Sequence, residues 1–245
     1  MKLLSLNLGR PEAVDVAEES KSVTGIDKRP VAGPVRVFAP GPKGIGASGV
    51  AGDAVCNTEH HGGDDQAVYA FAREDLDAWE RELGRALPSG SFGENLTTEG
   101  LDVSGALIGE RWRIGSEVIL EITAGRIPCL NFQRHMGERG WVRRFTRQGE
   151  PGAYLRVIQP GEIRAGDPIE IVHRPEHDIT VALTFRATMT EHELLPRLLA
   201  AGEALHPELL ETARKYVEKK EKAEKTRRSG ESEAAADGSP EAPGS

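Results

Sequence analysis

The chain has 245 residues and a net charge of −8 at pH 7, with 38% hydrophobic and 29% charged residues. This length fits one main domain with a smaller appendage, and the apolar fraction is sufficient for a buried core. The acidic balance argues against a nucleic-acid partner, and no apolar run approaches the roughly 18 residues that cross a bilayer.

The first apolar stretch is short and ends before Arg10, so it is unlike a secretory signal. We therefore expect a cytoplasmic protein that contacts neither nucleic acid nor a membrane.

Residues 1–174 are typical of a mainly β domain. Short runs rich in β-branched residues recur between glycines and prolines, as in a small barrel or sandwich. The predicted strands are residues 2–8, 34–39, 117–123, 154–159 and 169–172.

Two helices are predicted to interrupt this domain. In residues 73–83, Leu76, Trp79 and Leu83 follow one another at three- and four-residue steps, which is the spacing of one helical face. A second, shorter helix is predicted near residues 142–147.

The composition changes after residue 174. Thr190 and Glu193 form a capping-box pattern, which predicts a helix start at Thr190. Pro207 fits the first turn of a further helix that ends near Tyr216. Residues 175–218 are therefore predicted to form a small helical appendage. Residues 219–245 are charged and lack apolar periodicity, which predicts a disordered tail.

The phrase at residues 52–71 contains His60, His61, Gly62 and Gly63 in succession. Two imidazoles followed by two flexible residues favour a turn that lines a pocket, where backbone amides approach a ligand closely. A plain polar turn is the alternative. Zinc binding by the paired histidines is less favoured, because their spacing differs from that of the helical two-histidine motif.

A second phrase, residues 90–102, places Glu94 and Asn95 in a tight turn after Gly93. The Asn95 amide offers donors and an acceptor to the polar edge of a heterocycle. Alternatively, both side chains only hold their own turn together. The sequence leaves these two interpretations open.

The third phrase, TAGRIPCLNF, brings Arg126, Pro128 and Cys129 together after a predicted strand. A thiolate suits a soft metal, and a nearby guanidinium favours the thiolate form. An inert buried cysteine is the alternative. Two cysteines and seven histidines do not supply a Cys₄ or Cys₂His₂ zinc site, so any metal needs ligands from outside the protein.

Cations lie beside glycines at two predicted strand boundaries. Lys28 and Arg29 occupy one of them and Arg156 the other. Such cations can hold a phosphate or pterin group through charge-assisted hydrogen bonds. For Arg156 we favour the alternative, an ordinary exposed strand end.

Taken in order, these phrases resemble the MOSC family, named from the C-terminal domain of molybdenum cofactor sulfurase. They are most similar to its small stand-alone bacterial branch, whose members reduce N-hydroxylated compounds such as hydroxylaminopurine. The similarity spans residues 20–181 and lies in TGIDKRPV, GVAGDAVCNTEHHGGDDQAVYAF, FGENLTTEGL, IGERWRIGSEVILEIT, GRIPC, GAYLRVIQPGEIRAGD and IVHRPEHDITV. The chain departs from the branch at Gly125, where a proline is usual.

The resemblance implies a fold that is mainly β with α, a MOSC β-barrel-centred domain followed by a three-helix appendage. It implies a molybdenum cofactor (Mo-molybdopterin) with Cys129 as the ligand from the protein. It also implies reduction of N–OH to N–H in a small-molecule N-hydroxylated substrate, with electrons from a separate flavin or haem reductase. Cys56 is expected to be structural.

On this basis each predicted site residue has an expected role. Arg126 keeps the Cys129 sulfur anionic, and His61 or Glu94 protonates the departing water. Because the protein is acidic overall, the cofactor is expected to lie in a local positive region. The residues expected to bind the cofactor are Thr24, Lys28, Arg29, His61, Gly62, Gly63, Asn95 and Arg126.

Two other functions compete with the reductase. A non-catalytic carrier would use the same thiol to hand on sulfur or cofactor, and a hydrolase would use His60 and His61.

Overall fold

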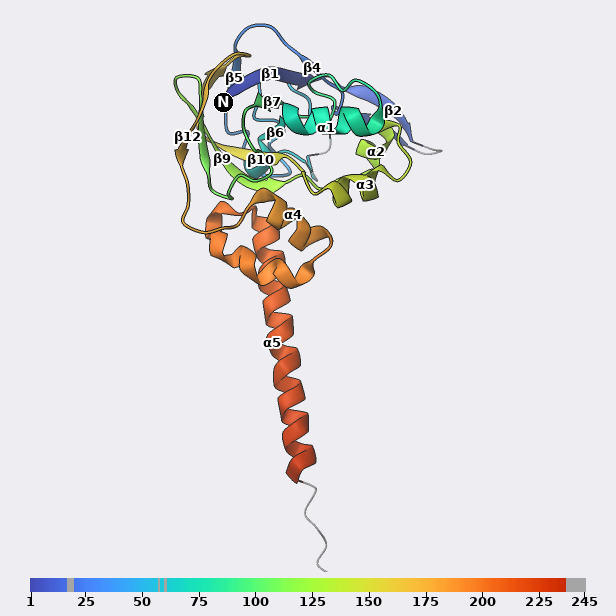
Figure 1. The fold of residues 1–245 in the computed structure, drawn as a ribbon, viewed down its shortest axis with the longest axis vertical. Helices are drawn as coiled ribbons and strands as arrows, with labels where there is room; N and C mark the ends of the chain where they lie inside the picture. The colour runs from blue at the N-terminus through green and yellow to red at the C-terminus, as the bar shows by residue number, and fades with distance from the viewer. Residues whose placement is uncertain (17–19, 57, 60, 237–245) are drawn as a thin grey trace, which may run out of the picture.

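The computed structural model describes residues 1–16, 20–56, 58, 59 and 61–236. Figure 1 shows a β-rich body, a group of short helices packed against one side of it, and a long helix that projects away.

The body is built on one eight-stranded sheet in the order β12-β8-β9-β10-β6-β7-β1-β4. All neighbours in this sheet are antiparallel except β6 and β7. The strands are β1 (Lys2–Gly9), β4 (Lys28–Pro30), β6 (Val68–Ala72), β7 (Leu96–Glu99), β8 (Arg111–Ile114), β9 (Val118–Gly125), β10 (Ala153–Gln159) and β12 (Ile169–His173).

The sheet curls so that β1 meets the chain entering β12. Leu3 N donates to Asp167 O over 2.9 Å, and Gly166 N donates to Leu3 O over 2.7 Å. Lys2 and Pro168 form a single antiparallel bridge at the same place. The enclosed core contains Leu3, Leu6, Val68, Leu96, Trp112, Ile122 and Leu155, all fully buried. The expected mainly β fold with added helices is confirmed.

Two smaller sheets flank the main one. β5 (Val35–Val37) pairs with β11 (Gly161–Ile163), and β2 (Glu12–Val16) pairs with β3 (Ser20–Thr24). The end of β3 and the start of β4 border the site described below.

A second core, made largely of aromatic side chains, lies beneath α1 (Arg73–Leu83), α2 (Leu130–Met136) and α3 (Trp141–Gln148). Trp79 of α1 and Trp141 of α3 have ring centroids 4.6 Å apart. Phe132 of α2 meets Phe92 edge-on at 5.3 Å, an arrangement that aromatic pairs prefer. This core anchors α2, and with it the segment that carries Cys129.

Local pattern predicted several of these elements. Helix α1 has the predicted bounds, and the five predicted strands begin and end within two residues of β1, β5, β9, β10 and β12. The predicted helix near residues 142–147 is α3. Helix α2 was not predicted, because its seven residues are too short to show a period.

Thr190 ends a helix instead of starting one, so that prediction was wrong. Helix α4 (Val181–Met189) begins after Thr180, whose hydroxyl accepts a hydrogen bond from Leu183 N over 3.0 Å. The Thr190 amide donates to Arg186 O over 2.9 Å and so continues the α4 hydrogen-bond ladder. A 3₁₀ segment, η2 (His192–Ala204), follows.

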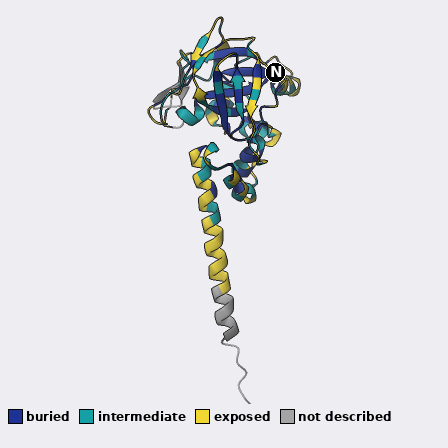
Figure 2. Ribbon diagram, turned by 90° about the vertical axis from the view of Figure 1, so that its left-hand side faces the viewer, coloured by how far each residue is buried: buried dark blue, intermediate teal, exposed yellow. Residues whose placement is uncertain are grey.

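Helix α5 (Pro207–Ala236) begins at the predicted Pro207 and continues beyond Lys219, into the segment where a disordered tail was expected. Residues 237–245 of that predicted tail lie outside the described residues. The expectation overlooked intrinsic helix propensity, since Glu, Lys, Arg and Ala are strong helix formers. Glu211 and Lys215 form an i,i+4 ion pair of 3.1 Å, which supports an isolated helix. Figure 2 shows that the middle of α5 is exposed on all sides visible in that view.

None of the helices in the described residues combines the length and apolarity that crossing a membrane requires.

Candidate functional site

One cavity of about 660 Å³ collects most of the predicted site residues. Its volume lies in the range of roughly 300–1,000 Å³ that is usual for small-molecule and cofactor sites. The predicted residues that line it are Thr24, Lys28, His61, Gly62, Asn95, Arg126 and Cys129.

Cys129 stands directly before α2, in extended backbone with φ −128° and ψ 171°. It is half-buried. Phe132 and Met136 hold α2 in the aromatic core, and Asn131 Nδ2 donates to Thr24 Oγ1 over 2.8 Å. The thiol therefore has a fixed place in the cavity wall, between the end of β3 and α2.

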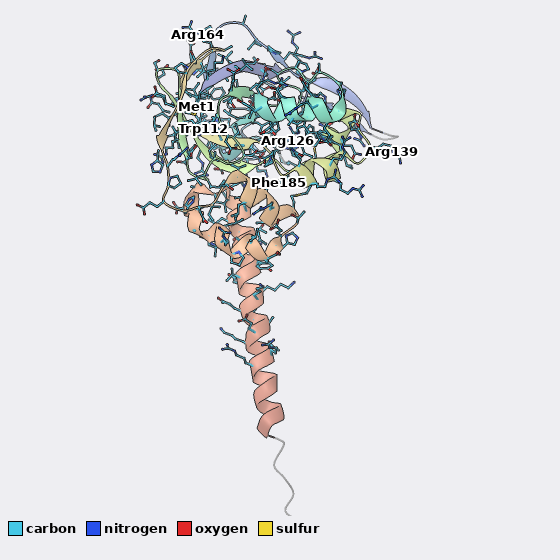
Figure 3. All side chains as sticks on the ribbon, in the orientation of Figure 1. Met1, Trp112, Arg126, Arg139, Arg164 and Phe185 are labelled. Carbon is cyan, nitrogen blue, oxygen red and sulfur yellow. The ribbon has the colours of Figure 1, made fainter. Side chains whose placement is uncertain are left out.

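Arg126 stands three residues before Cys129 in the chain. It is buried, with 8% of its surface exposed. Its guanidinium lies over the ring of Phe132, 4.0 Å from the centroid, and it donates to the Phe92 carbonyl. Figure 3 shows Arg126 inside the body, whereas the exposed Arg139 and Arg164 lie at its periphery.

No carboxylate in the described part of the chain lies within 4.0 Å of the Arg126 guanidinium. A buried charge is costly unless an opposite charge or a ligand compensates it. The wall beside Cys129 is therefore suited to an anionic group.

Lys28 differs from Arg126 because it already has a partner within the protein. Its ammonium forms an ion pair with Asp53, and the two side chains are 7% and 1% exposed. Burial lowers the pKa of Lys28, and the attraction of Asp53 opposes that effect only in part. Lys28 therefore contributes less positive potential to the cavity than the sequence suggested.

Asn95 lines the cavity, but its amide is engaged by the protein. Its Nδ2 donates to Asp53 Oδ2 over 2.9 Å and to Asn7 O over 3.3 Å. Its Oδ1 accepts from Tyr69 N over 3.2 Å. These bonds favour a structural role over the expected contact with a heterocycle.

Glu94 is fully buried and is not part of the cavity lining, so the structure does not bring it to the site. Its carboxylate accepts from Gly90 N over 2.5 Å, Phe92 N over 3.0 Å and Thr97 Oγ1 over 2.8 Å. Burial raises the pKa of Glu94, and these hydrogen bonds oppose the rise. These contacts favour the alternative, that Glu94 holds its own turn, over the expected role as a proton donor.

The glycines after the histidine pair are required by backbone packing. Gly62 has φ 78°, and a Cβ there would lie 2.3 Å from Ala47 O. Gly63 has φ 79° and does not line the cavity. His61 lines the cavity and is exposed, whereas His60 lies outside the described residues.

Two further cations lie away from the cavity. Arg29 is 73% exposed and pairs with Asp27 at 2.8 Å, so its expected contact with the cofactor is not supported by its position. Arg156 pairs with Asp65 at 2.6 Å and with Glu121 at 3.3 Å, which is a structural role.

Several cavity residues were not predicted from the sequence. Tyr69 of β6 and Tyr154 of β10 have ring centroids 5.0 Å apart, and burial raises the pKa of both. Asp53 and Asn131 also line the cavity. These side chains carry no local motif, because strand pairing and loop packing bring them together.

Cys56 was expected to be structural, and its position does not support that role. It is exposed and lines the same cavity as Cys129. Partial burial of its sulfur raises the pKa of the thiol, and the nearby Lys28 opposes that rise. The cavity therefore has two thiols.

Among the described residues, no group of three or more His, Cys, Asp or Glu side chains is placed to hold a metal ion. A metal bound by Cys129 would thus depend on ligands that come with a cofactor.

Comparison with known proteins gives a consistent result. A sequence model of the MOSC domain matches residues 57–170. Protein YflK of Bacillus subtilis is 32% identical over 184 residues, which cover 75% of this chain and 79% of YflK. A protein of Gibberella moniliformis named "Reductase" is 31% identical over 138 residues, or 55% of this chain and 24% of that protein. The crystal structure of YiiM from Geobacillus stearothermophilus superposes with a TM-score of 0.69 at 26% identity, covering 87% of this chain and 97% of that one.

Proposed function

The chain belongs to the MOSC domain family, and on that premise we propose that it is a molybdenum-cofactor-dependent reductase of N-hydroxylated compounds. Cys129 would be the ligand from the protein to molybdenum. The observation that carries this proposal is the shared cavity of a half-buried thiol, Cys129, and a buried guanidinium without a carboxylate partner in the described chain, Arg126.

The cavity residues fit the proposed cofactor. Molybdopterin carries a phosphate and a metal dithiolene, both negatively charged, and Arg126 offers a buried positive charge that has no carboxylate partner among the described residues. Molybdenum accepts a soft sulfur donor such as the Cys129 thiolate. The Thr24 hydroxyl and the backbone at Gly62 border the same space and would contact the pterin. The match to a protein named as a reductase supports the class of reaction.

When bound, the cofactor would supply the redox chemistry, with two electrons arriving from a separate flavin or haem reductase. The protein would hold the metal through Cys129, and Arg126 would place a positive charge close to that sulfur. The rings of the buried Tyr69 and the half-buried Tyr154 would limit the access of water to that wall. The N–O bond of the substrate would be cleaved to N–H, and the oxygen would leave as water.

Elemental analysis tests the cofactor. Protein purified from a cell that makes the molybdenum cofactor is expected to contain molybdenum and pterin, whereas zinc alone would contradict the proposal. The two cysteines provide matched variants, because each removes one thiol from the same cavity. Cys129→Ser is expected to lose the metal and Cys56→Ser to retain it. The reverse pattern would assign the ligand to Cys56.

Turnover tests the reaction. The holoprotein with a chemical reductant is expected to convert an N-hydroxylated purine to the amine, and Cys129→Ser is expected to abolish the conversion. A protein that binds molybdenum and pterin but gives no conversion would be a carrier of the cofactor.

A further inference from the structure

The Lys28–Asp53 ion pair is a second feature of the cavity that the proposed roles of Cys129 and Arg126 leave unused. Both residues line the cavity, yet their side chains are almost fully buried. Lysine is seldom buried to this degree unless it is paired. The pair therefore places an ionisable N–H donor in the wall of a space large enough for a substrate.

The position of the pair is set by the fold. Pairing of β1 with β4 places Lys28 opposite Gly9. Asp53 accepts from Gly9 N over 2.8 Å, from Ser48 Oγ over 2.7 Å and from Asn95 Nδ2 over 2.9 Å, in addition to the Lys28 ammonium. With four donors directed at it, the Asp53 carboxylate is held before any ligand binds.

Burial and the charged groups around Lys28 shift its pKa in opposite directions. Burial and the Arg126 guanidinium lower the pKa of Lys28, whereas Asp53 and Glu94 raise it. The Cys56 thiol lies close enough for Lys28 to affect its pKa. The lowering effects dominate, so the Lys28 ammonium is a stronger acid than an exposed lysine, as general acid catalysis near neutral pH requires.

Other donors are less suited. Glu94 is not part of the lining, and the Tyr69 hydroxyl donates its proton to Pro151 O over 2.7 Å. His61 lines the cavity but is exposed, whereas Lys28 is buried in the wall.

We propose that Lys28 is the general acid of this cavity and that Asp53 is the residue that positions it. The inference rests on the proposed reductase function. As the N–O bond of the N-hydroxylated substrate breaks, the hydroxyl oxygen takes a proton from Lys28 Nζ and leaves as water. The nitrogen receives two electrons, which come from the flavin or haem reductase, and one proton from solvent. Solvent then reprotonates Lys28.

Lys28→Arg separates the charge of this residue from its acidity. Arginine keeps the positive charge, but its pKa lies far above that of lysine, which prevents it from giving up a proton near neutral pH. We expect this variant to retain molybdenum and to lose turnover per bound molybdenum by about a hundredfold or more, which is the usual contribution of a general acid. Lys2→Arg is the matched control, because Lys2 is an exposed partner of Glu99, and it should change neither quantity.

Asp53→Asn tests the positioning role and does not depend on the folding of the first variant. Turnover should fall as pH rises through the pKa of Lys28, because the ammonium is the active form. Removing the Asp53 charge lowers that pKa further, so the falling limb should move to lower pH by about one unit. The titration of Lys28 in apoprotein labelled at the lysine side chains, followed by NMR, should show the same change in the absence of cofactor.

The outcomes separate the two proposals. A wild-type protein that binds no molybdenum or gives no reduction would overturn the proposed function, and this inference with it. If the wild type is active, undiminished turnover in Lys28→Arg would overturn this inference alone. An unchanged falling limb in the pH profile of Asp53→Asn would also overturn this inference alone. So would a Lys28 titration like that of the exposed lysines.

Discussion

Replacing Arg126 by methionine should separate cofactor binding from folding. In the apoprotein the change removes a hydrogen bond to the buried Phe92 carbonyl, which costs about 1–3 kcal/mol, and a cation–π contact with Phe132 worth about 2 kcal/mol. It also removes a buried charge that has no carboxylate partner in the part of the chain that the structure describes, a gain of several kcal/mol. Methionine packs well against aromatic rings. These effects nearly cancel, so the free energy of unfolding should change by less than about 2 kcal/mol.

The holoprotein should respond differently. Removing one member of a buried charge pair commonly costs about 3–5 kcal/mol, and each 1.4 kcal/mol is a factor of ten in affinity. Cofactor affinity should therefore fall by about a hundredfold or more. The molybdenum-to-protein ratio measures this, and urea unfolding of the apo form measures stability. Arg81→Ala on α1, where the exposed Arg81 donates to Asp77 O, is the control. A ratio for Arg126→Met equal to that of wild type would refute the reasoning.

Three further changes follow from the structure. Lys28→Ala leaves Asp53 without its cation and should destabilise the apoprotein by about 3–5 kcal/mol in urea unfolding, with partial recovery in a double variant that adds Asp53→Asn. This revises the expectation that Lys28 acts mainly on cofactor retention, and an unaltered unfolding midpoint would contradict it. Burial, with repulsion from Glu150, raises the pKa of Asp75 from 3.8 to about 7. Because the folded carboxyl keeps its proton where the unfolded one has lost it, Asp75 costs stability progressively as pH rises from about 4 to 7. Asp75→Asn should therefore be more stable than wild type at pH 8, by at most about 4 kcal/mol, and equal to it below pH 4; equal melting curves at pH 8 would argue against the shift. Deleting residues 221–245 should leave the melting temperature nearly unchanged, because the described side chains of this segment are exposed; a fall of many degrees would show that it docks.

Local patterns were enough to predict the elements whose own residues determine them. Helix α1 was predicted to its ends because Leu76 and Trp79 repeat at helical spacing and are the residues it buries. The strands were predicted because β-branched residues recur between turns. Helix α5 shows the limit of composition, since a charged segment without an apolar face was expected to be disordered although its residues favour helix.

The cavity was predicted in part. Cys129 and Arg126 are three residues apart in one phrase, so their proximity could be inferred from the chain alone. The partners that decide the charge of the site could not be inferred from the chain alone. Asp53 reaches Lys28 only because β1 pairs with β4, and Glu94 is withdrawn from the site by bonds within its own turn. A cation in a motif therefore indicates a site, but its counter-ion depends on the tertiary fold.

The projecting end of α5 affects how the size of this protein is measured. At about 1.5 Å per residue, residues 219–236 extend roughly 27 Å along the helix axis. Figure 1 shows this segment directed away from the body. An elongated particle has a larger frictional coefficient than a sphere of equal mass. A monomer of 26.5 kDa should therefore elute early in gel filtration and resemble a dimer, and light scattering is the suitable measure of its mass.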